Sequence, residues 1–106
     1  IRIPDFELNL DRLDLWPEGL LHLAPSHTPD ALAQLALRLR QALQEAGFAI
    51  EQRAYRPHLT LARHSTLPEI VTAPKVSWTA REFSLFSSAQ GVHGAHYRAL
   101  GSWPLR

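Results

Sequence analysis

Two polar side chains near the middle of the chain, His58 and Thr60, have the types and the spacing that phosphate chemistry requires. Residues two apart on an extended strand point to the same face of a sheet, so the imidazole and the hydroxyl are expected side by side. A neutral imidazole accepts a proton and a hydroxyl donates a hydrogen bond. A phosphate ester needs both groups, because its oxygens take hydrogen bonds and its displacement needs a proton carrier. The same alternation directs Leu59 and Leu61 into the core behind this pair.

The eight residues around this pair, Arg56-Pro57-His58-Leu59-Thr60-Leu61-Ala62-Arg63, resemble the second signature of the 2H phosphoesterases, which are named for two His-x-Thr/Ser motifs. The branch they resemble is that of the bacterial RNA 2′,3′-cyclic phosphodiesterases, historically called 2′-5′ RNA ligases. The similarity spans nearly the whole chain. It includes strand-like segments before the motif, and segments after it that look like the closing strands of the family, at residues 6–10, 20–23, 83–88 and 97–100.

The resemblance implies a reaction and the residues that carry it. The reaction is hydrolysis of an RNA 2′,3′-cyclic phosphate, or of a cyclic nucleotide, to a 2′-phosphate without metal or cofactor, with weak 2′-5′ ligation as its reverse. His58 and Thr60 are expected to be catalytic, as proton carrier and as donor to a phosphate oxygen. Arg63, which fits the family's motif, and Tyr97, in a segment that resembles a closing strand, are expected to contact the substrate. Phe86 is expected to do so for a different reason: its parity differs from that of Phe83 and Leu85, which leaves its ring free to face a cleft. Strict alternation places Arg63 on the face opposite His58, unless a bulge or the strand end returns it.

The chain also departs from the family pattern. Members of the family carry one motif in each of two similar lobes, whereas we identify one motif in these 106 residues, at His58. The segment His22-Leu23-Ala24 lacks the hydroxyl. We therefore expect residues 1–106 to be a single domain, the C-terminal lobe, with the first motif in an N-terminal lobe outside this sequence. The full-length protein is expected to be a monomer, with a two-fold dimer as the alternative.

Composition excludes several functional classes. The net charge is +1, from eleven Lys and Arg against ten Asp and Glu, which neither predicts nor excludes contact with a nucleotide end. The absence of cysteine excludes disulfides and thiolate zinc sites. No apolar stretch approaches the ~20 residues that span a bilayer, so we expect a cytoplasmic protein without membrane contact. His93 and His96 have a zinc-like spacing but no third ligand, so no metal site is expected.

The elements predicted before the motif are two strands and a helix. Residues 6–10 alternate as a strand, a bulge or bend follows near Asp11, and a turn at Pro17-Glu18-Gly19 leads into a buried strand over residues 20–24. Apolar residues at helical spacing then predict a helix over residues 29–46. Thr28 is its expected N-cap and Gly47 its expected stop.

The elements predicted after the helix complete an α+β fold. A short extended piece over residues 48–52 precedes the strand 58–62, and a helical turn is expected near residues 68–71. A strand over residues 82–88 and a turn at residues 90–94 predict a closing hairpin. The predicted architecture is an antiparallel sheet packed on one main helix, which corresponds to one lobe, with closing strands, of the two-lobed family fold.

Three functional hypotheses remain open. In the first, the chain supplies one catalytic wall of an RNA cyclic phosphodiesterase. In the second, it binds a phosphate or a nucleotide end without turning it over. In the third, it is a structural half-domain that pairs with a partner. Turnover of a 2′,3′-cyclic nucleotide without metal distinguishes the first hypothesis, and phosphate binding without turnover distinguishes the second.

Overall fold

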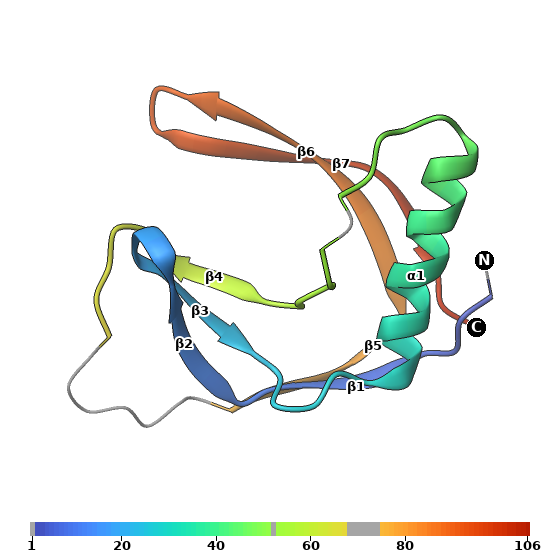
Figure 1. Ribbon diagram of the computed structural model, residues 1–106, viewed down its shortest axis with the longest axis horizontal. Helices are drawn as coiled ribbons and strands as arrows, with labels where there is room; N and C mark the ends of the chain where they lie inside the picture. Colours follow the sequence, from blue (N-terminus) through green and yellow to red (C-terminus); the bar gives the residue numbers. More distant parts are fainter. Residues whose placement is uncertain (1, 52, 68–74) are drawn as a thin grey trace.

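The computed structural model describes residues 2–51, 53–67 and 75–106, which form one α-helix and seven β-strands (Figure 1). The elements follow one another as β1 (Phe6–Leu10), β2 (Arg12–Trp16), the 3-10 turn η1 (Pro17–Gly19), β3 (Leu20–Ala24), α1 (Asp30–Glu45), β4 (Leu59–Ala62), β5 (Val76–Ala80), β6 (Glu82–Gly91) and β7 (Gly94–Pro104). The predicted helical turn near residues 68–71 lies outside the described residues. The predicted extended piece is not a strand over residues 48–51.

The strands pair in three separate antiparallel sheets. β1 pairs with β5, β3 lies between β2 and β4, and β6 pairs with β7. The predicted bend near Asp11 marks the change from the first sheet to the second, and the Asp11 amide donates to the carbonyl of Ala24 at 3.2 Å. The prediction of an α+β fold with antiparallel strands and one main helix is therefore confirmed. The sheet is divided into three parts rather than continuous.

The helix α1 agrees with its predicted range at both ends to within one residue. Gly47 has a φ of 94°, and the Phe48 amide donates to the carbonyl of Leu43 at 3.0 Å, as expected for a glycine stop. The prediction that Thr28 caps the N-terminus is wrong. Pro29 occupies the cap position with a ψ of 141°, and no side chain caps the helix, so the Thr28 hydroxyl stands one residue too far out.

The hydrophobic core lies where α1 meets the two chain ends. Ile3, Leu35 and Leu105 form its buried centre. The Arg106 amide donates to the carbonyl of Ile3 at 2.7 Å, so the ends of the chain lie side by side, next to α1 in Figure 1. Partly buried side chains of β1, α1, β5 and β6 surround this centre, namely Phe6, Ala31, Leu39, Ala80 and Phe83.

The prediction that Leu59 and Leu61 enter the core is wrong, because each side chain is 48% exposed. The helix packs on β1, β5 and β6 instead, and no residue of β4 belongs to the core cluster. Of the three strands in its sheet, β3 is the one with fully buried side chains, at His22, Leu23 and Ala24. The alternating pattern of β4 thus shows which residues share a face and not which face is covered.

Candidate functional site

The three-stranded sheet β2–β3–β4 places three polar residues in one row. Asp14 on β2 lies opposite His22 on β3, and His22 lies opposite Thr60 on β4. Side chains that are directly opposite in antiparallel strands point to the same face. His58 comes immediately before β4, and its ring centroid lies 5.8 Å from that of His22. The structure therefore brings His58 to the face on which Thr60 lies, as the spacing of the motif predicts.

A main-chain hydrogen bond fixes the orientation of the His58 ring. Its Nδ1 lies 2.9 Å from the carbonyl oxygen of Arg56, two residues earlier. A carbonyl oxygen can only accept, so Nδ1 carries the hydrogen and the lone pair of the neutral ring is on Nε2. The side chain is exposed to solvent. Nε2 is thus available to take a proton from a bound water or hydroxyl.

Two aromatic residues below His58 belong to this site and were not identified from the sequence. The Trp16 ring centroid lies 4.5 Å from that of His58, edge to face, and 3.9 Å from that of His22. His22 is completely buried; its Nδ1 donates to the carbonyl of Leu20 at 3.1 Å, and its Nε2 has no partner among the described residues. The sequence carried one indication that Trp16 and His22 are close: the tight turn at Pro17–Gly19 joins β2 and β3 in a hairpin.

Two pockets meet at the segment that leads into β4. The larger, about 770 Å³, has His58 in its wall and extends to Leu20 and Arg40. The smaller, about 200 Å³, is lined on its far side by Arg12, Asp14 and Thr28. Three residues line both pockets: Trp16, Tyr55 and Arg56. Partial burial raises the pKa of the Tyr55 phenol above its ordinary value of 10.0, which is already far above neutral pH, so the hydroxyl can donate a hydrogen bond.

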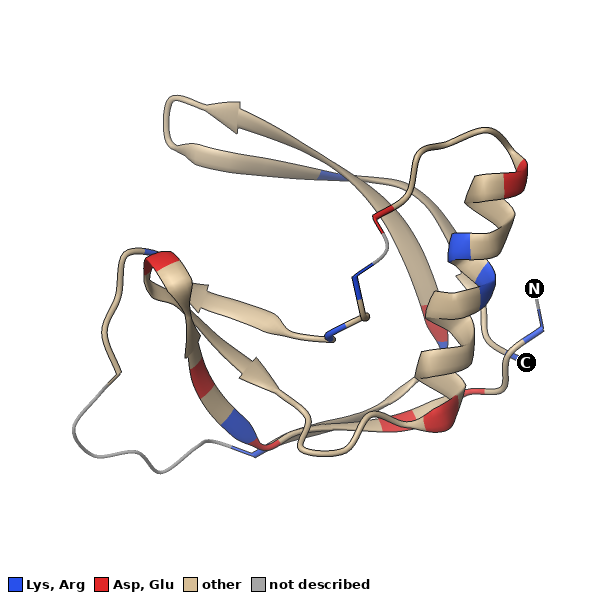
Figure 2. Ribbon diagram, viewed as in Figure 1, with Lys and Arg blue, Asp and Glu red and all other residues tan. Residues whose placement is uncertain are grey.

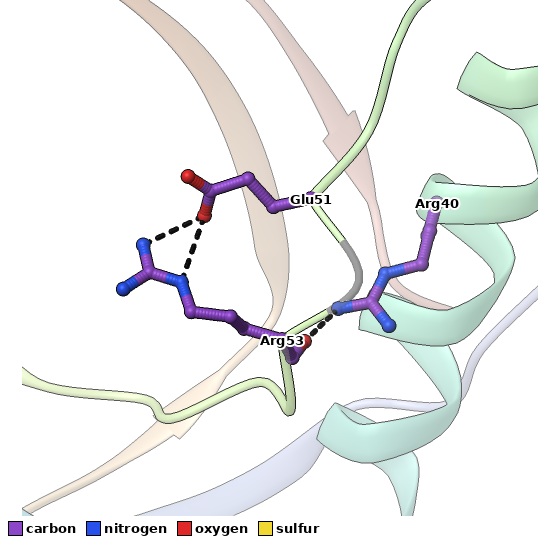
Figure 3. A network of polar contacts seen from close by, with 3 residues as sticks. All are labelled: Arg40, Glu51 and Arg53. Atoms are coloured by element: carbon purple, nitrogen blue, oxygen red, sulfur yellow. Dashed lines mark hydrogen bonds and ion pairs between the residues drawn. The ribbon is translucent and has the colours of Figure 1, made fainter.

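Basic residues around the larger pocket differ in what they contact (Figure 3). The Arg53 guanidinium donates to Oε2 of Glu51 at 2.7 and 3.1 Å. The Arg40 Nη2 donates to the main-chain carbonyl of Arg53 at 2.7 Å, which ties α1 to the segment before β4. Arg56 makes no side-chain hydrogen bond or ion pair within the described parts of the chain. Among these three arginines, Arg56 is the one whose guanidinium has no polar partner in the described residues.

A bulge in β4 changes the face on which Arg63 is expected, because strict alternation would have placed it opposite His58. Leu21 pairs with Ala62 whereas His22 pairs with Thr60, so two steps along β4 match one step along β3. The extra residue reverses the alternation after Thr60. Arg63 follows the strand directly and is exposed. With the alternation reversed, Arg63 is expected on the same face of the sheet as His58.

The spacing His-x-Thr occurs a second time in the sequence, at His64 and Thr66. These residues lie beyond the end of β4, where His64 has a φ of 54°. The Ser65 amide between them donates to the carbonyl of Gly19 at 2.9 Å. Because this segment is a bend and not a strand, the two side chains do not share a sheet face as His58 and Thr60 do.

Phe86 and Tyr97, the two other residues expected to contact substrate, lie on the hairpin β6–β7. Phe86 pairs with Ala99, and Tyr97 pairs with Ser88, so the two rings share one face as diagonal neighbours. They are 55% and 66% exposed. Neither ring lines the two pockets near His58. The structure therefore groups these two residues with each other but not with His58.

The described residues offer no group of three His, Cys, Asp or Glu side chains arranged to hold a metal ion. This includes His93 and His96, the pair with a zinc-like spacing. Within the same residues, no helix has the length and apolar character needed to cross a bilayer.

Comparison with known proteins agrees with this fold and site. Residues 23–97 match the family model described as LigT like Phosphoesterase. Two relatives named RNA 2′,3′-cyclic phosphodiesterase, from Escherichia coli and Bacillus subtilis, are 31% and 35% identical over 99% and 79% of this chain. The aligned parts cover 61% and 51% of those relatives, so the chain spans little more than half of their length.

A solved structure shows the same arrangement of elements. The crystal structure of E. coli LigT complexed with 3′-AMP is 33% identical and superimposes with a TM-score of 0.83, over 99% of this chain and 62% of that one. The match to the family model covers well over half of the sequence and includes the strand with Thr60 and the preceding His58. The chain therefore belongs to the LigT-like phosphoesterase family.

Proposed function

We propose that this chain supplies one catalytic wall of an RNA 2′,3′-cyclic phosphodiesterase, with His58 and Thr60 as its catalytic residues. The observation that carries the proposal is the orientation of His58. Its Nδ1–H is held by the Arg56 carbonyl, which leaves Nε2 as a proton acceptor in the wall of the larger pocket. The names of the two relatives indicate the same substrate class.

The chemistry needs two proton transfers on opposite sides of phosphorus. A water oxygen forms a bond to phosphorus, the bond to the ribose 3′-oxygen breaks, and a 2′-phosphate remains. In our proposal His58 Nε2 takes the proton from the attacking water as general base. The Thr60 hydroxyl donates to a non-bridging oxygen, whose negative charge grows in the transition state. Arg63 adds a positive charge to the same phosphate.

The departing 3′-oxygen must receive a proton from a second group. We propose that this group lies in an N-terminal lobe outside these 106 residues, which carries the other His-x-Thr/Ser motif of the family. With a 5′-hydroxyl in place of water, the same two groups would give the weak 2′-5′ ligation: the 5′-oxygen forms a bond to phosphorus of the cyclic phosphate while the bond to the 3′-oxygen breaks, and the 3′-oxygen takes up a proton.

One experiment tests the proposal on the protein with both lobes. Hydrolysis of a 2′,3′-cyclic nucleotide is measured in the presence of a chelator, and the product is identified as the 2′- or 3′-phosphate. His58→Ala is expected to lower turnover by at least ~10²-fold. His93→Ala is the matched control, because His93 lies in the turn of the β6–β7 hairpin. Near-wild-type hydrolysis by His58→Ala would exclude the proposed role of His58.

The alternative of a lobe that binds phosphate without turnover has one observation in its favour. Within the described residues, His58 and Thr60 form the one His-x-Thr pair set by a strand, because the pair at His64 lies on a bend. A single imidazole can serve one side of phosphorus only. Saturable binding of inorganic phosphate, lost in Thr60→Val and without any turnover, would favour this alternative.

A further inference from the structure

The segment of residues 55–57 separates the two pockets and presents an aromatic ring and a cation to both. Trp16 also lines both pockets, but its ring is already engaged with the rings of His22 and His58. Tyr55 is 48% exposed and makes no ring contact within the described residues. Its phenol carries its proton at neutral pH, and partial burial raises its pKa further. Tyr55 thus offers a free aromatic surface next to His58.

Two arginines in this region, Arg56 and Arg12, have no polar side-chain partner among the described residues, and Glu18 is the carboxylate of the larger pocket that likewise has none. Arg56 faces both pockets and Arg12 lines the smaller one. The acidic residue of the smaller pocket, Asp14, has its Oδ1 occupied by the amide of Leu15 at 2.8 Å. Two guanidinium groups along one short path suit a chain of phosphates, because Arg binds phosphate oxygens through several parallel donors.

The sizes of the two pockets suggest what each can hold. A volume of about 770 Å³ lies in the range of pockets that enclose a small organic ligand, and a nucleoside is of that size. The pocket of about 200 Å³ is too small for a second nucleoside and suits a phosphate group. Single-stranded RNA is typically held by stacking of bases on aromatic rings and by Arg contacts to the backbone.

We propose that residues 55–57 form a subsite for the RNA strand on the 5′ side of the cyclic phosphate. The terminal nucleoside lies in the larger pocket with its base on Tyr55. The phosphodiester on its 5′ side is bound by Arg56, and Arg12 attracts the strand at the smaller pocket. This inference rests on the proposed function, and it adds the residues that hold the strand beside the cyclic phosphate: Tyr55, Arg56 and Arg12.

The test compares two substrates that differ in one phosphodiester. A cyclic mononucleotide with a 5′-hydroxyl is measured beside a dinucleotide that ends in the same 2′,3′-cyclic phosphate. The protein with both lobes is expected to process the dinucleotide with a kcat/KM about tenfold higher, mainly through KM, as one charge-assisted contact would give. Arg56→Gln is expected to bring the ratio of the two kcat/KM values close to one.

The fold offers good controls for this substitution. The Arg56 side chain can be replaced without loss of the hydrogen bond to His58, because that bond is made by the main-chain carbonyl. Arg81→Gln is the matched control, since Arg81 lies between β5 and β6 and lines neither pocket. Tyr55→Phe is expected to keep the affinity that stacking provides, and Tyr55→Ala is expected to lose it.

A binding measurement separates this inference from the proposed function. Adenosine and adenosine 5′-monophosphate are titrated into the protein while the NMR signals of the Tyr55 ring and the Arg56 Nε–H are followed. Tighter binding of the monophosphate, lost in Arg56→Gln, supports the subsite even if no cyclic phosphate is hydrolysed. Equal binding of both ligands, or hydrolysis without preference for the dinucleotide, overturns it.

Discussion

The three-stranded sheet β2–β3–β4 and the hairpin β6–β7 are both antiparallel, yet their side chains are covered very differently. The sheet buries His22, Leu23 and Ala24. The hairpin, a long two-stranded arm in Figure 1, has no fully buried residue. Its large apolar side chains are 46% exposed or more, except for Phe83: Leu85, Phe86, Val92, Tyr97, Leu100 and Trp103.

Charge sharpens the same contrast (Figure 2). Between residues 83 and 104, Arg98 is the single Lys, Arg, Asp or Glu. The segment that leads into β4 carries Arg53 and Arg56, and Glu51 pairs with Arg53. A region that is exposed, apolar and almost uncharged is typical of an interface, whereas a basic segment beside a pocket is typical of a binding site. The hairpin β6–β7 thus has the character of an interface, and the segment before β4 has the character of a binding site.

The largest difference between the two regions is expected in stability. His22→Ala should lower the free energy of unfolding by about 2 to 4 kcal/mol, because it leaves a cavity beneath Trp16. His93→Ala, in the exposed turn of the hairpin, should change it by less than about 0.5 kcal/mol. Urea unfolding followed by tryptophan fluorescence measures both. A similar small effect for the two variants would show that His22 is accessible in solution.

A second substitution at the same position separates packing from polarity. His22→Phe keeps an aromatic ring against Trp16 and removes the buried Nε2 that lacks a partner. Its free energy of unfolding is therefore expected to be at least as high as that of the parent protein. A marked loss of stability in His22→Phe would mean that Nε2 has a partner in solution.

The next largest effect is expected on activity, at Thr60 in the row of polar residues on the sheet β2–β3–β4. Thr60→Val keeps the β-branched shape and removes the hydroxyl, so turnover of a cyclic phosphate is expected to fall by about tenfold to a hundredfold, with unchanged stability. Thr79→Val on β5 is the control, because Thr79 is an exposed strand residue in a different sheet. Equal activity of the two variants would remove Thr60 from the proposed mechanism.

A smaller effect is expected at the junction of the first two sheets. Hydrogen bonds from the Ser26 hydroxyl and from the Ser26 amide, both 2.7 Å long, hold the pKa of the Asp11 carboxyl below its ordinary value of 3.8. A lowered pKa in the folded state stabilises the fold above pH 3.8, and this contribution disappears as the pH falls through the lowered value. Ser26→Ala should raise the Asp11 pKa, as an NMR titration of the carboxyl carbon would show.

The smallest effect on stability is expected in the hairpin. Phe86→Ser and Tyr97→Ser should each change the free energy of unfolding by less than about 0.5 kcal/mol, because both rings are more than half exposed. If these residues contact RNA, as the sequence predicts, the KM for an oligonucleotide should rise while the melting temperature stays constant. A melting temperature that drops sharply would indicate that the rings are packed in solution.

Local patterns predicted most of the elements. The stop of α1 at Gly47 follows from a single residue, because glycine adopts the left-handed conformation without strain. The turn at Pro17–Gly19 and the alternation of residues 6–10 are local in the same way. The predicted Thr28 cap is wrong because the helix begins one residue later, with Pro29 rather than Thr28 at the cap position.

Which face of a strand is buried, and where two strands pair, depend on distant parts of the chain. Local sequence patterns did not predict these two features. Leu59 and Leu61 alternate as core residues do, but the helix that would cover them packs elsewhere. The bulge opposite Leu21 and His22 has no glycine or other local sign in β4. The sequence places His22 in a buried strand but does not predict its contact with the ring of Trp16, because that contact exists only once β2 and β3 pair. The sequence therefore predicted the His58 motif but not the residues that pack around it.

The hydrogen bond between Ile3 and Arg106 has a consequence for synthesis. The core contains Ile3 from the start of the chain, Leu35 from its middle and Leu105 from its end. A ribosome releases the first two long before the third, so the nascent chain must keep an apolar cluster unfinished until Leu105 emerges. A chain truncated before Leu105 would therefore leave the helix without part of its core, although every residue of the His58 motif is present.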